Sequence, residues 1–112
     1  MQLNGIIIMA IKVASNGVAG SEDIDRVWMI NTQSNSGPFG WLDKKGIDTF
    51  LDEIESEERD FLYPEYDREQ VSRFLNPFIK KGHIGEDAGQ GIYTYPDPAY
   101  QEAAFLLNPF QE

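Results

Sequence analysis

Hydrophobic residues recur every three to four positions over most of the chain, which predicts a series of short amphipathic helices. The first is expected over residues 3–15, because no helix breaker follows Gly5 and Asn16-Gly17 is typical of a helix C-terminus. The β-branched run over residues 6–11 also suits a strand. A helix is the favoured interpretation, and a strand is the alternative.

Four further helices follow from the same periodicity. Ser21 is a natural N-cap, since acidic residues fill the first turn after it. Pro38 suits the first position of a short helix that ends before Gly46, and the next helix is expected to continue to about Glu58. The strongest amphipathic helix ends at Gly82, and its apolar positions are Val71, Phe74, Leu75, Phe78 and Ile79.

The last third of the chain has a different pattern. Four glycines between residues 82 and 91 predict a loop, and the alternation over residues 92–95 predicts a short extended piece. Residues 98–108 are sufficient for a final short helix. We find no internal repeat. The order of elements therefore predicts an all-α fold, a single small domain of about five to six helices spanning residues 1–112.

Composition excludes several classes of function. The 112 residues are 41% hydrophobic, which suits one domain with a core, and the net charge of -10 disfavours nucleic acid or an anionic membrane as a partner. The absence of cysteine removes disulfides, thiolate zinc sites and cysteine nucleophiles, and a reducing cytoplasm is the expected location. The apolar stretch over residues 5–11 is interpreted as a buried helix, since no basic region precedes it and Lys12 ends it.

Candidate chemical groups are few. His83 is the only histidine, and with no second His or Cys to share a metal it is interpreted as a loop residue. Ten of the nineteen acids lie between Asp48 and Glu69. The face that carries Asp52, Glu55 and Glu58 could bind a hard cation or supply a carboxylate pair, but a solvated helix face is favoured, so no metal site is expected. The Gly89-Gln90-Gly91 segment lacks a preceding strand, so no dinucleotide-binding site is expected.

Three motifs occur in a fixed order along the chain. They are Gly17-Val18-Ala19 with Glu22-Asp23-Ile24-Asp25-Arg26-Val27, Gly37-Pro38-Phe39-Gly40-Trp41-Leu42-Asp43 with Gly46-Ile47-Asp48-Thr49, and Gly82-His83-Ile84-Gly85 with Gly89-Gln90-Gly91-Ile92-Tyr93-Thr94-Tyr95-Pro96. Together they resemble the C-terminal domain of NAD-dependent 3-hydroxyacyl-CoA dehydrogenases, and the bacterial 3-hydroxybutyryl-CoA form most of all. The resemblance covers nearly the whole chain.

The resemblance implies a helical domain with the 6-phosphogluconate dehydrogenase C-terminal-domain-like fold, which follows a Rossmann domain and closes one wall of the acyl-CoA cleft. In that family the catalytic His and Glu dyad and the NAD site lie in the N-terminal half, so no catalytic or cofactor-binding residue is assigned to this chain. It would not be competent alone. The alternative is a free-standing, non-catalytic dimeric interaction module with the same fold.

The resemblance also implies substrate-side residues. The family's Gly-Pro-Phe turn lies near the acyl and pantetheine path, which makes Ser36, Gly37, Pro38 and Phe39 the candidates here; a helix start that merely packs is the alternative. The family has an active-site Asn early in the first helix of this domain. Asn4 matches that residue only if one helical turn is deleted from the alignment.

Self-association is expected through the first helix. Its apolar residues cover nearly the whole circumference, which is more than one intramolecular partner is expected to hide. These residues are Ile6, Ile7, Ile8, Met9, Ile11 and Val13. A symmetric homodimer would supply the second cover, and the family resemblance implies the same pairing.

Overall fold

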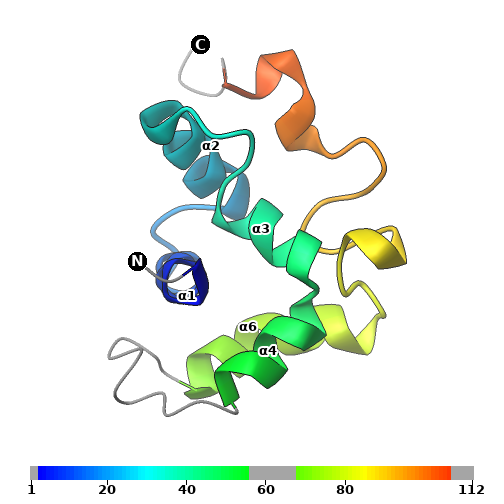
Figure 1. The fold of residues 1–112 in the computed structure, drawn as a ribbon. Helices are drawn as coiled ribbons and strands as arrows, with labels where there is room; N and C mark the ends of the chain where they lie inside the picture. Colours follow the sequence, from blue (N-terminus) through cyan, green and yellow to red (C-terminus); the bar gives the residue numbers. More distant parts are fainter. Residues whose placement is uncertain (1–2, 56–67, 107–112) are drawn as a thin grey trace.

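A computed structural model describes residues 3–55 and 68–106 as a helical assembly (Figure 1). Its helices are α1 (Leu3–Ser15), α2 (Ser21–Thr32), α3 (Pro38–Lys45), α4 (Ile47–Glu55) and α6 (Arg68–Lys80), followed by the 3-10 turns η1 (Glu86–Ala88), η2 (Ala99–Gln101) and η3 (Ala103–Leu106). The predicted all-α fold is confirmed, and the strand alternative for α1 is wrong. The predicted continuation of α4 to Glu58 lies outside the described residues. No helix in the described ranges is long and apolar enough to cross a bilayer.

Helix α3 occupies the middle of the arrangement (Figure 1). It contacts α1, α2 and α4, while α4 packs against α6. The 3-10 turns η2 and η3 return to α2, at the end of the molecule away from α4 and α6. Helix α3 therefore lies between α2 on one side and the packed pair of α4 and α6 on the other (Figure 1).

Helix α1 is covered by its own chain, which corrects the reason given for dimerisation. Ile7, Ile8 and Ile11 are 0–1% exposed because α3, α6 and α2 pack around α1 on three sides. Among the apolar residues of α1 whose burial is described, Met9 alone is exposed, at 49%, while Ile6 is half-buried. The buried isoleucines join a core that also contains Phe39, Leu42, Ile47, Phe50, Ile54, Val71 and Leu75.

Two helix ends follow the glycine chemistry expected of them. Gly17 has a φ of +75°, and the amides of Gly17 and Val18 donate to the carbonyls of Ala14 and Val13. This is the paired hydrogen-bond pattern of a Schellman motif. Gly82, with a φ of +77°, ends α6 in the same way. The predicted ends of α1 and α6 are confirmed.

Ser21 is not the N-cap of α2. The helix begins one position earlier than expected, because the Gly20 carbonyl already accepts the Ile24 amide at 3.0 Å. Gly20 has extended backbone angles and is the N-cap, without a side-chain hydrogen bond. Ser21 is therefore the first helical residue.

The C-terminal third differs from the pattern in two places. Within residues 92–95 only Thr94 takes part in an isolated bridge, with Gln90, because the amides of Ile92 and Tyr93 donate to the Asp43 carboxylate instead of to a neighbouring strand. Residues 99–106 form two 3-10 turns, separated at Glu102 by an extended conformation. Tyr100 and Phe105, on either side of this break, are both buried in the core.

Candidate functional site

Asp25 is a fully buried carboxylate that joins α2 to the first turn of α3. Its Oδ1 accepts the Phe39 amide at 2.9 Å, and its Oδ2 accepts the Gly40 amide at 3.0 Å and the Tyr93 hydroxyl at 2.9 Å. The first amides of a helix have no intrahelical acceptor. Asp25 therefore caps α3 from a neighbouring helix, and its negative charge suits the positive end of the α3 dipole.

Asp43 performs a matching task near the other end of α3. Its Oδ1 accepts the Ile92 amide at 2.8 Å, while its Oδ2 accepts the Tyr93 amide and the Tyr95 hydroxyl, both at 2.9 Å. Gly91 lies so close that an added Cβ would stand 2.3 Å from Asp43 Oδ1. Asp43 thus holds the loop of residues 91–95 against α3, and the contact requires glycine at position 91.

The hydrogen-bonded side chains form a cluster that we call the aspartate–tyrosine network, which comprises Asp25, Asp43, Tyr93, Tyr95 and Tyr100. Burial is the main influence on the pKa values of its members. Desolvation raises the pKa of Asp25 to about 6, against the opposing effect of its three hydrogen-bond donors. Desolvation also raises the pKa of Asp43, again against its donors. The pKa values of Tyr93 and Tyr95 lie well above their usual range, chiefly because of burial, so both hydroxyls remain donors at neutral pH.

The network connects the three motifs that carry the family resemblance. Asp25 belongs to the first motif, Asp43 to the second, and the two tyrosines to the third. Sequence reasoning missed this connection. An available signal was Asp25 itself, a charge next to the apolar stripe of α2 rather than opposite it, and a second was the Tyr-x-Tyr alternation of residues 93–95.

The four predicted residues of the Gly-Pro-Phe turn are all buried. Ser36 is 2% exposed and its Oγ donates to the Gly37 carbonyl at 3.2 Å. Gly37 lies against Asp25, where a Cβ would stand 2.6 Å from the carboxylate. The Phe39 ring packs on Phe74, with centroids 5.8 Å apart. Within this chain, the side chains of Ser36, Pro38 and Phe39 pack inside instead of facing solvent.

Asn4 lies in a separate, half-buried polar cluster formed by Asn4, Lys45 and Glu53. The Asn4 Nδ2 donates to Glu53 Oε1 at 3.2 Å, and Lys45 Nζ donates to the same oxygen at 3.0 Å. These two donors lower the pKa of Glu53. The Asn4 Oδ1 is buried and accepts no hydrogen bond from the described residues. A buried acceptor without a donor is unfavourable.

The structure does not bring Asn4 and the Gly-Pro-Phe turn together. Lys45 is the last residue of α3 and Pro38 is the first, so the polar cluster and the turn lie at opposite ends of that helix. Eight helical residues span about 10 Å, at a rise of 1.5 Å per residue. The two predicted sets could therefore touch one extended ligand at separate points, but they do not form one compact site.

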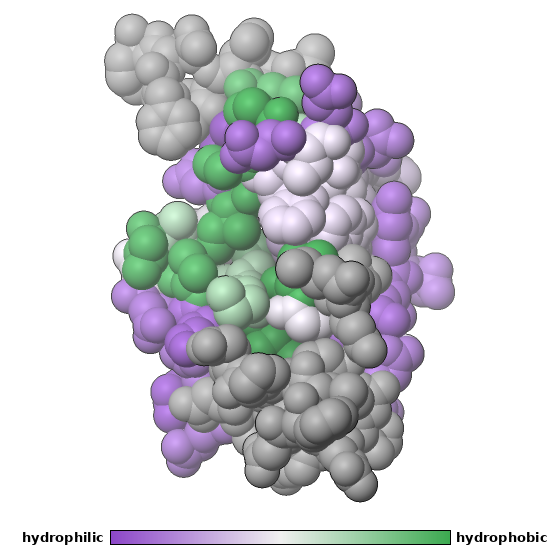
Figure 2. Space-filling model, turned by 60° about the vertical axis from the view of Figure 1, so that its left-hand side comes forward, coloured by the Kyte–Doolittle hydropathy of each residue, from purple (hydrophilic) through white to green (hydrophobic). Residues whose placement is uncertain are grey.

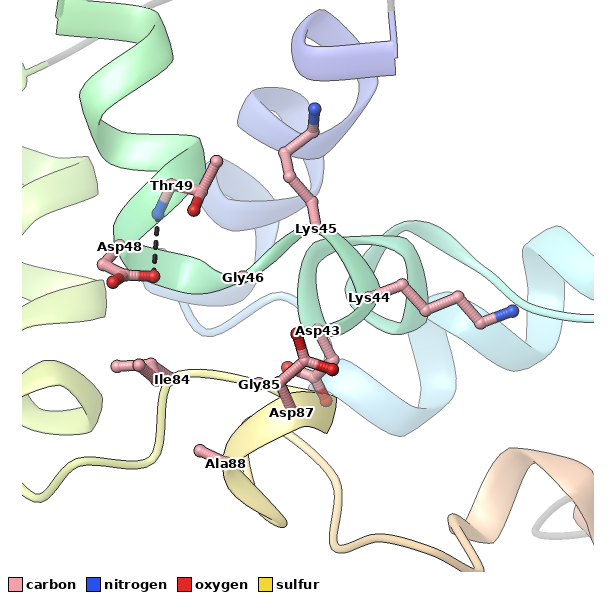
Figure 3. Close-up of a pocket in the computed structure, with 10 residues that line it drawn as sticks. All are labelled: Asp43, Lys44, Lys45, Gly46, Asp48, Thr49, Ile84, Gly85, Asp87 and Ala88. Carbon is pink, nitrogen blue, oxygen red and sulfur yellow. Dashed lines mark hydrogen bonds between the residues drawn. The ribbon is translucent and has the colours of Figure 1, made fainter.

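A small hollow lies between the end of α3, the start of α4 and η1 (Figure 3). Its volume is about 220 Å³, below the range typical of ligand pockets. Lys44 and Lys45 border it but direct their ammonium groups away from it (Figure 3). The Asp48 carboxylate accepts the Thr49 amide at 2.8 Å. Within the described ranges, no group of three His, Cys, Asp or Glu side chains could hold a metal ion.

The Gly89-Gln90-Gly91 segment does not fit a dinucleotide. It follows the 3-10 turn η1 instead of a strand, and the Gly89 carbonyl accepts the Tyr95 amide from the following loop. The space beside Gly91 is filled by the Asp43 carboxylate, whose charge would repel a pyrophosphate. No step of nicotinamide chemistry is therefore assigned to this segment.

Comparison with known proteins supports the family at the level of sequence. A sequence model described as the C-terminal domain of 3-hydroxyacyl-CoA dehydrogenase matches residues 3–95. The chain is 31% identical over 90 residues to the mitochondrial hydroxyacyl-coenzyme A dehydrogenase of Sus scrofa. This alignment covers 80% of this chain and 28% of that enzyme. It is 27% identical over 89 residues to a 3-hydroxybutyryl-CoA dehydrogenase of Mycobacterium tuberculosis, covering 80% of this chain and 30% of that protein.

Solved structures agree with the sequence comparison. The (S)-3-hydroxybutyryl-CoA dehydrogenase of Ralstonia eutropha aligns with a TM-score of 0.67 and 28% identity, over 85% of this chain and 32% of that one. A diketoreductase aligns with a TM-score of 0.69 and 28% identity, over 83% and 31%. The chain thus spans less than one third of the length of these relatives. It belongs to the 3-hydroxyacyl-CoA dehydrogenase family and corresponds to that family's C-terminal domain.

Proposed function

We propose that this chain is the substrate-side domain of an NAD-dependent 3-hydroxyacyl-CoA dehydrogenase of fatty-acid or butanoate metabolism, acting in the cytoplasm. The complete enzyme would oxidise 3-hydroxyacyl-CoA to 3-oxoacyl-CoA, with a Rossmann domain supplied in cis or in trans. That domain would bind NAD and carry the acid–base dyad. The observation that carries the proposal is the family match through residues 3–95, whose motifs the aspartate–tyrosine network connects.

The polar cluster is the best candidate for contact with the reacting part of the substrate. No donor among the described residues reaches the buried Asn4 Oδ1, and a substrate hydroxyl or a group of the Rossmann domain that reached it would satisfy it. Glu53, which also accepts a hydrogen bond from Lys45, holds the amide of Asn4 in one orientation. Ser36, Gly37, Pro38 and Phe39 would instead support the cleft wall from beneath, at the other end of α3.

Complementation tests this function. The chain would be mixed with the separately expressed Rossmann domain of the Ralstonia eutropha enzyme, and NADH formation from 3-hydroxybutyryl-CoA followed by absorbance. We expect no turnover and no calorimetric NAD binding by the chain alone, and turnover by the mixture. Asn4→Ala should lower kcat/KM by about tenfold to a hundredfold, while the exposed Asn76→Ala should not.

Two outcomes would contradict the proposal. One is micromolar affinity of the isolated chain for NAD, which would place the cofactor site in these residues. The other is an active mixture in which Asn4→Ala and Asn76→Ala have equal rates, which would remove the polar cluster from the substrate path. A mixture that stays inactive although the two domains bind each other would favour the free-standing interaction module.

We also propose a homodimer, on the outer face of α1 and the adjoining part of α2. Met9, Val27 and Ile30 are 49%, 49% and 54% exposed, and apolar side chains that gather into one patch mark interaction surfaces. Figure 2 shows hydrophobic residues gathered on the face that these two helices share. The face replaces the buried isoleucines of α1 as the basis for self-association, and either the enzyme domain or the interaction module could use it.

A further inference from the structure

The C-terminal segment of residues 98–106 lies beyond the family match, which ends at residue 95. We call this segment the strap. It contributes two aromatic side chains to the core, Tyr100 at 3% exposed and Phe105 at 6% exposed. Its turns η2 and η3 both contact α2. The chain therefore adds its own cover to a helical body that the family match already completes.

Tyr100 acts as a plug over the first turn of α3. Its ring is so close to Gly40 that an added Cβ would stand 3.2 Å from Tyr100 Cε2. The same added atom would lie 1.9 Å from the Ser36 Oγ, so Tyr100 and Ser36 converge on one spot. The Tyr100 ring meets the Tyr93 ring edge to face, with centroids 4.9 Å apart. Tyr100 thus helps to close the Ser36–Gly40 edge of α3 from solvent.

Arg26 acts as a latch for the end of the strap. Its side chain is buried, its Nε donates to the Phe105 carbonyl, and its guanidinium carbon lies 4.5 Å from the Phe105 ring centroid. Asp23, one turn earlier on α2, accepts from Arg26 Nη1 and holds the guanidinium in place. One arginine therefore binds both the backbone and the ring of Phe105.

The backbone of the strap is weakly tied to the body. Its backbone-to-backbone hydrogen bonds within the described chain close its own turns, from Gln101 to Pro98, Glu102 to Ala99 and Phe105 to Glu102. Attachment thus depends on two rings, the Arg26 latch and the 3.4 Å contact between the Tyr95 and Tyr100 hydroxyls. A segment with so few long-range bonds opens at a lower free energy than packed helices do.

We propose that the strap opens as a unit, without unfolding of α1, α3 or α6, and that it thereby controls access to the Ser36–Gly40 edge of α3. Tyr100 is the plug and Arg26 is the latch. The meaning of that edge as part of the substrate-side wall rests on the proposed function above. On that basis the strap is a built-in gate, which must open before a ligand can reach the edge.

Thiol labelling can measure this opening directly, because the chain contains no cysteine. Ser36→Cys places a thiol under the plug, and Ala10→Cys places one in α1, at a buried position away from the strap. Each would be combined with Arg26→Ala or with the control Arg73→Ala, which removes an exposed ion pair. Labelling by a small disulfide reagent would follow the exposure of each thiol.

We expect the thiol at position 36 to react at least about tenfold faster than the thiol at position 10, since the strap opens more often than the helices. Arg26→Ala should accelerate labelling at position 36 by a further tenfold or so, because it removes a hydrogen bond to a charged group. It should change labelling at position 10 much less, and Arg73→Ala should change neither. Equal rates at the two positions in every background would overturn the proposal.

Hydrogen exchange gives a second measurement that needs no cysteine. In the unmodified chain, the amides of Gln101, Glu102 and Phe105 should exchange faster than those of α1 and α6, and Arg26→Ala should widen the difference. Strap amides as slow as helix amides would show that the segment is part of the core and no gate. Neither measurement involves substrate or a Rossmann domain, so failure of the gate and failure of the proposed function are separate results.

Discussion

Asp25 lies on α2 but caps α3. Replacing its carboxylate by an amide tests how much this cap stabilises the fold. Its two oxygens accept two backbone amides of α3, so Asp25→Asn would turn an NH2 group toward an amide donor. Leaving a buried donor unpaired should lower the free energy of unfolding by about 2–4 kcal/mol. Urea denaturation near pH 7 measures the change.

The matched control is Asp48→Asn. Asp48 is exposed and accepts the neighbouring Thr49 amide, so its loss should cost less than about 1 kcal/mol. Equal losses for the two variants would show that Asp25 does not support α3 from α2.

The raised pKa of Asp25 should make the free energy of unfolding depend on pH. Its pKa is about 6 in the folded protein and 3.8 in its ordinary state, so between these values the folded chain binds the proton more tightly than the unfolded chain. This contribution therefore stabilises the protein as the pH falls from about 7 toward 4, by at most about 3 kcal/mol. The raised pKa of Asp43 acts in the same direction.

Urea midpoints measured between about pH 7 and pH 5 would show the effect, as a rise on acidification. Asp25→Asn should reduce the rise and leave the part that Asp43 supplies. A wild-type protein that loses stability over this range, with the same slope in the variant, would show that Asp25 is ionised as easily when folded as when unfolded.

At the scale of the element, α1 offers adjacent positions with opposite environments. Ile8 is 1% exposed and Met9 is 49% exposed. Ile8→Ala should cost about 2–5 kcal/mol of unfolding free energy through the cavity it leaves, and Met9→Ala less than about 0.5 kcal/mol. Urea denaturation at low protein concentration would measure both. Similar losses at the two positions would mean that the chain does not cover α1 by itself.

Because Ile8 is buried, a charged side chain at this position should prevent folding. Ile8→Asp would place an unpaired carboxylate among the core residues of α1, α3 and α6, so an unfolded chain is the expected result. Far-ultraviolet circular dichroism would show the loss of helix. A folded monomer from this variant would mean that Ile8 lies at an interface between copies and not in the core.

At the scale of the whole molecule, the net charge disfavours self-association and the exposed apolar face favours it. Two copies at -10 each repel, and salt screens that repulsion, so self-association should tighten as ionic strength rises. Sedimentation equilibrium at tens of micromolar protein should show a dimer. Met9→Asp should give a folded monomer, while Asn76→Asp on α6 should leave the dimer intact.

A folded monomer of the unmodified chain at that concentration, in low and in high salt, would sink the homodimer proposal. A dimer that survives Met9→Asp would place the interface away from the outer face of α1. Circular dichroism of the same samples would show that each variant has kept its helices.

The sequence by itself was sufficient for features that depend on neighbours in the chain. The ends of α1 and α6 follow from Gly17 and Gly82, because a left-handed backbone after a helix is a local preference of glycine. The helical spacing of apolar residues predicted α2, α4 and α6, helix breakers and helix-end residues predicted α1 and α3, and the motifs predicted the family. Position 21 was misjudged by one residue, since a cap can shift without a change in the pattern.

Only the tertiary structure decided which residues of the three motifs form hydrogen bonds with one another. Asp25 receives a hydrogen bond from a tyrosine 68 positions away, and Asp43 holds a loop 49 and 50 positions away. No periodicity encodes such partners, because the hydrogen bonds form only after the helices pack. The same packing buried Ile8 and exposed Met9, placed Asn4 and Ser36 at opposite ends of α3, and broke the expected last helix between Tyr100 and Phe105, which are both buried in the core.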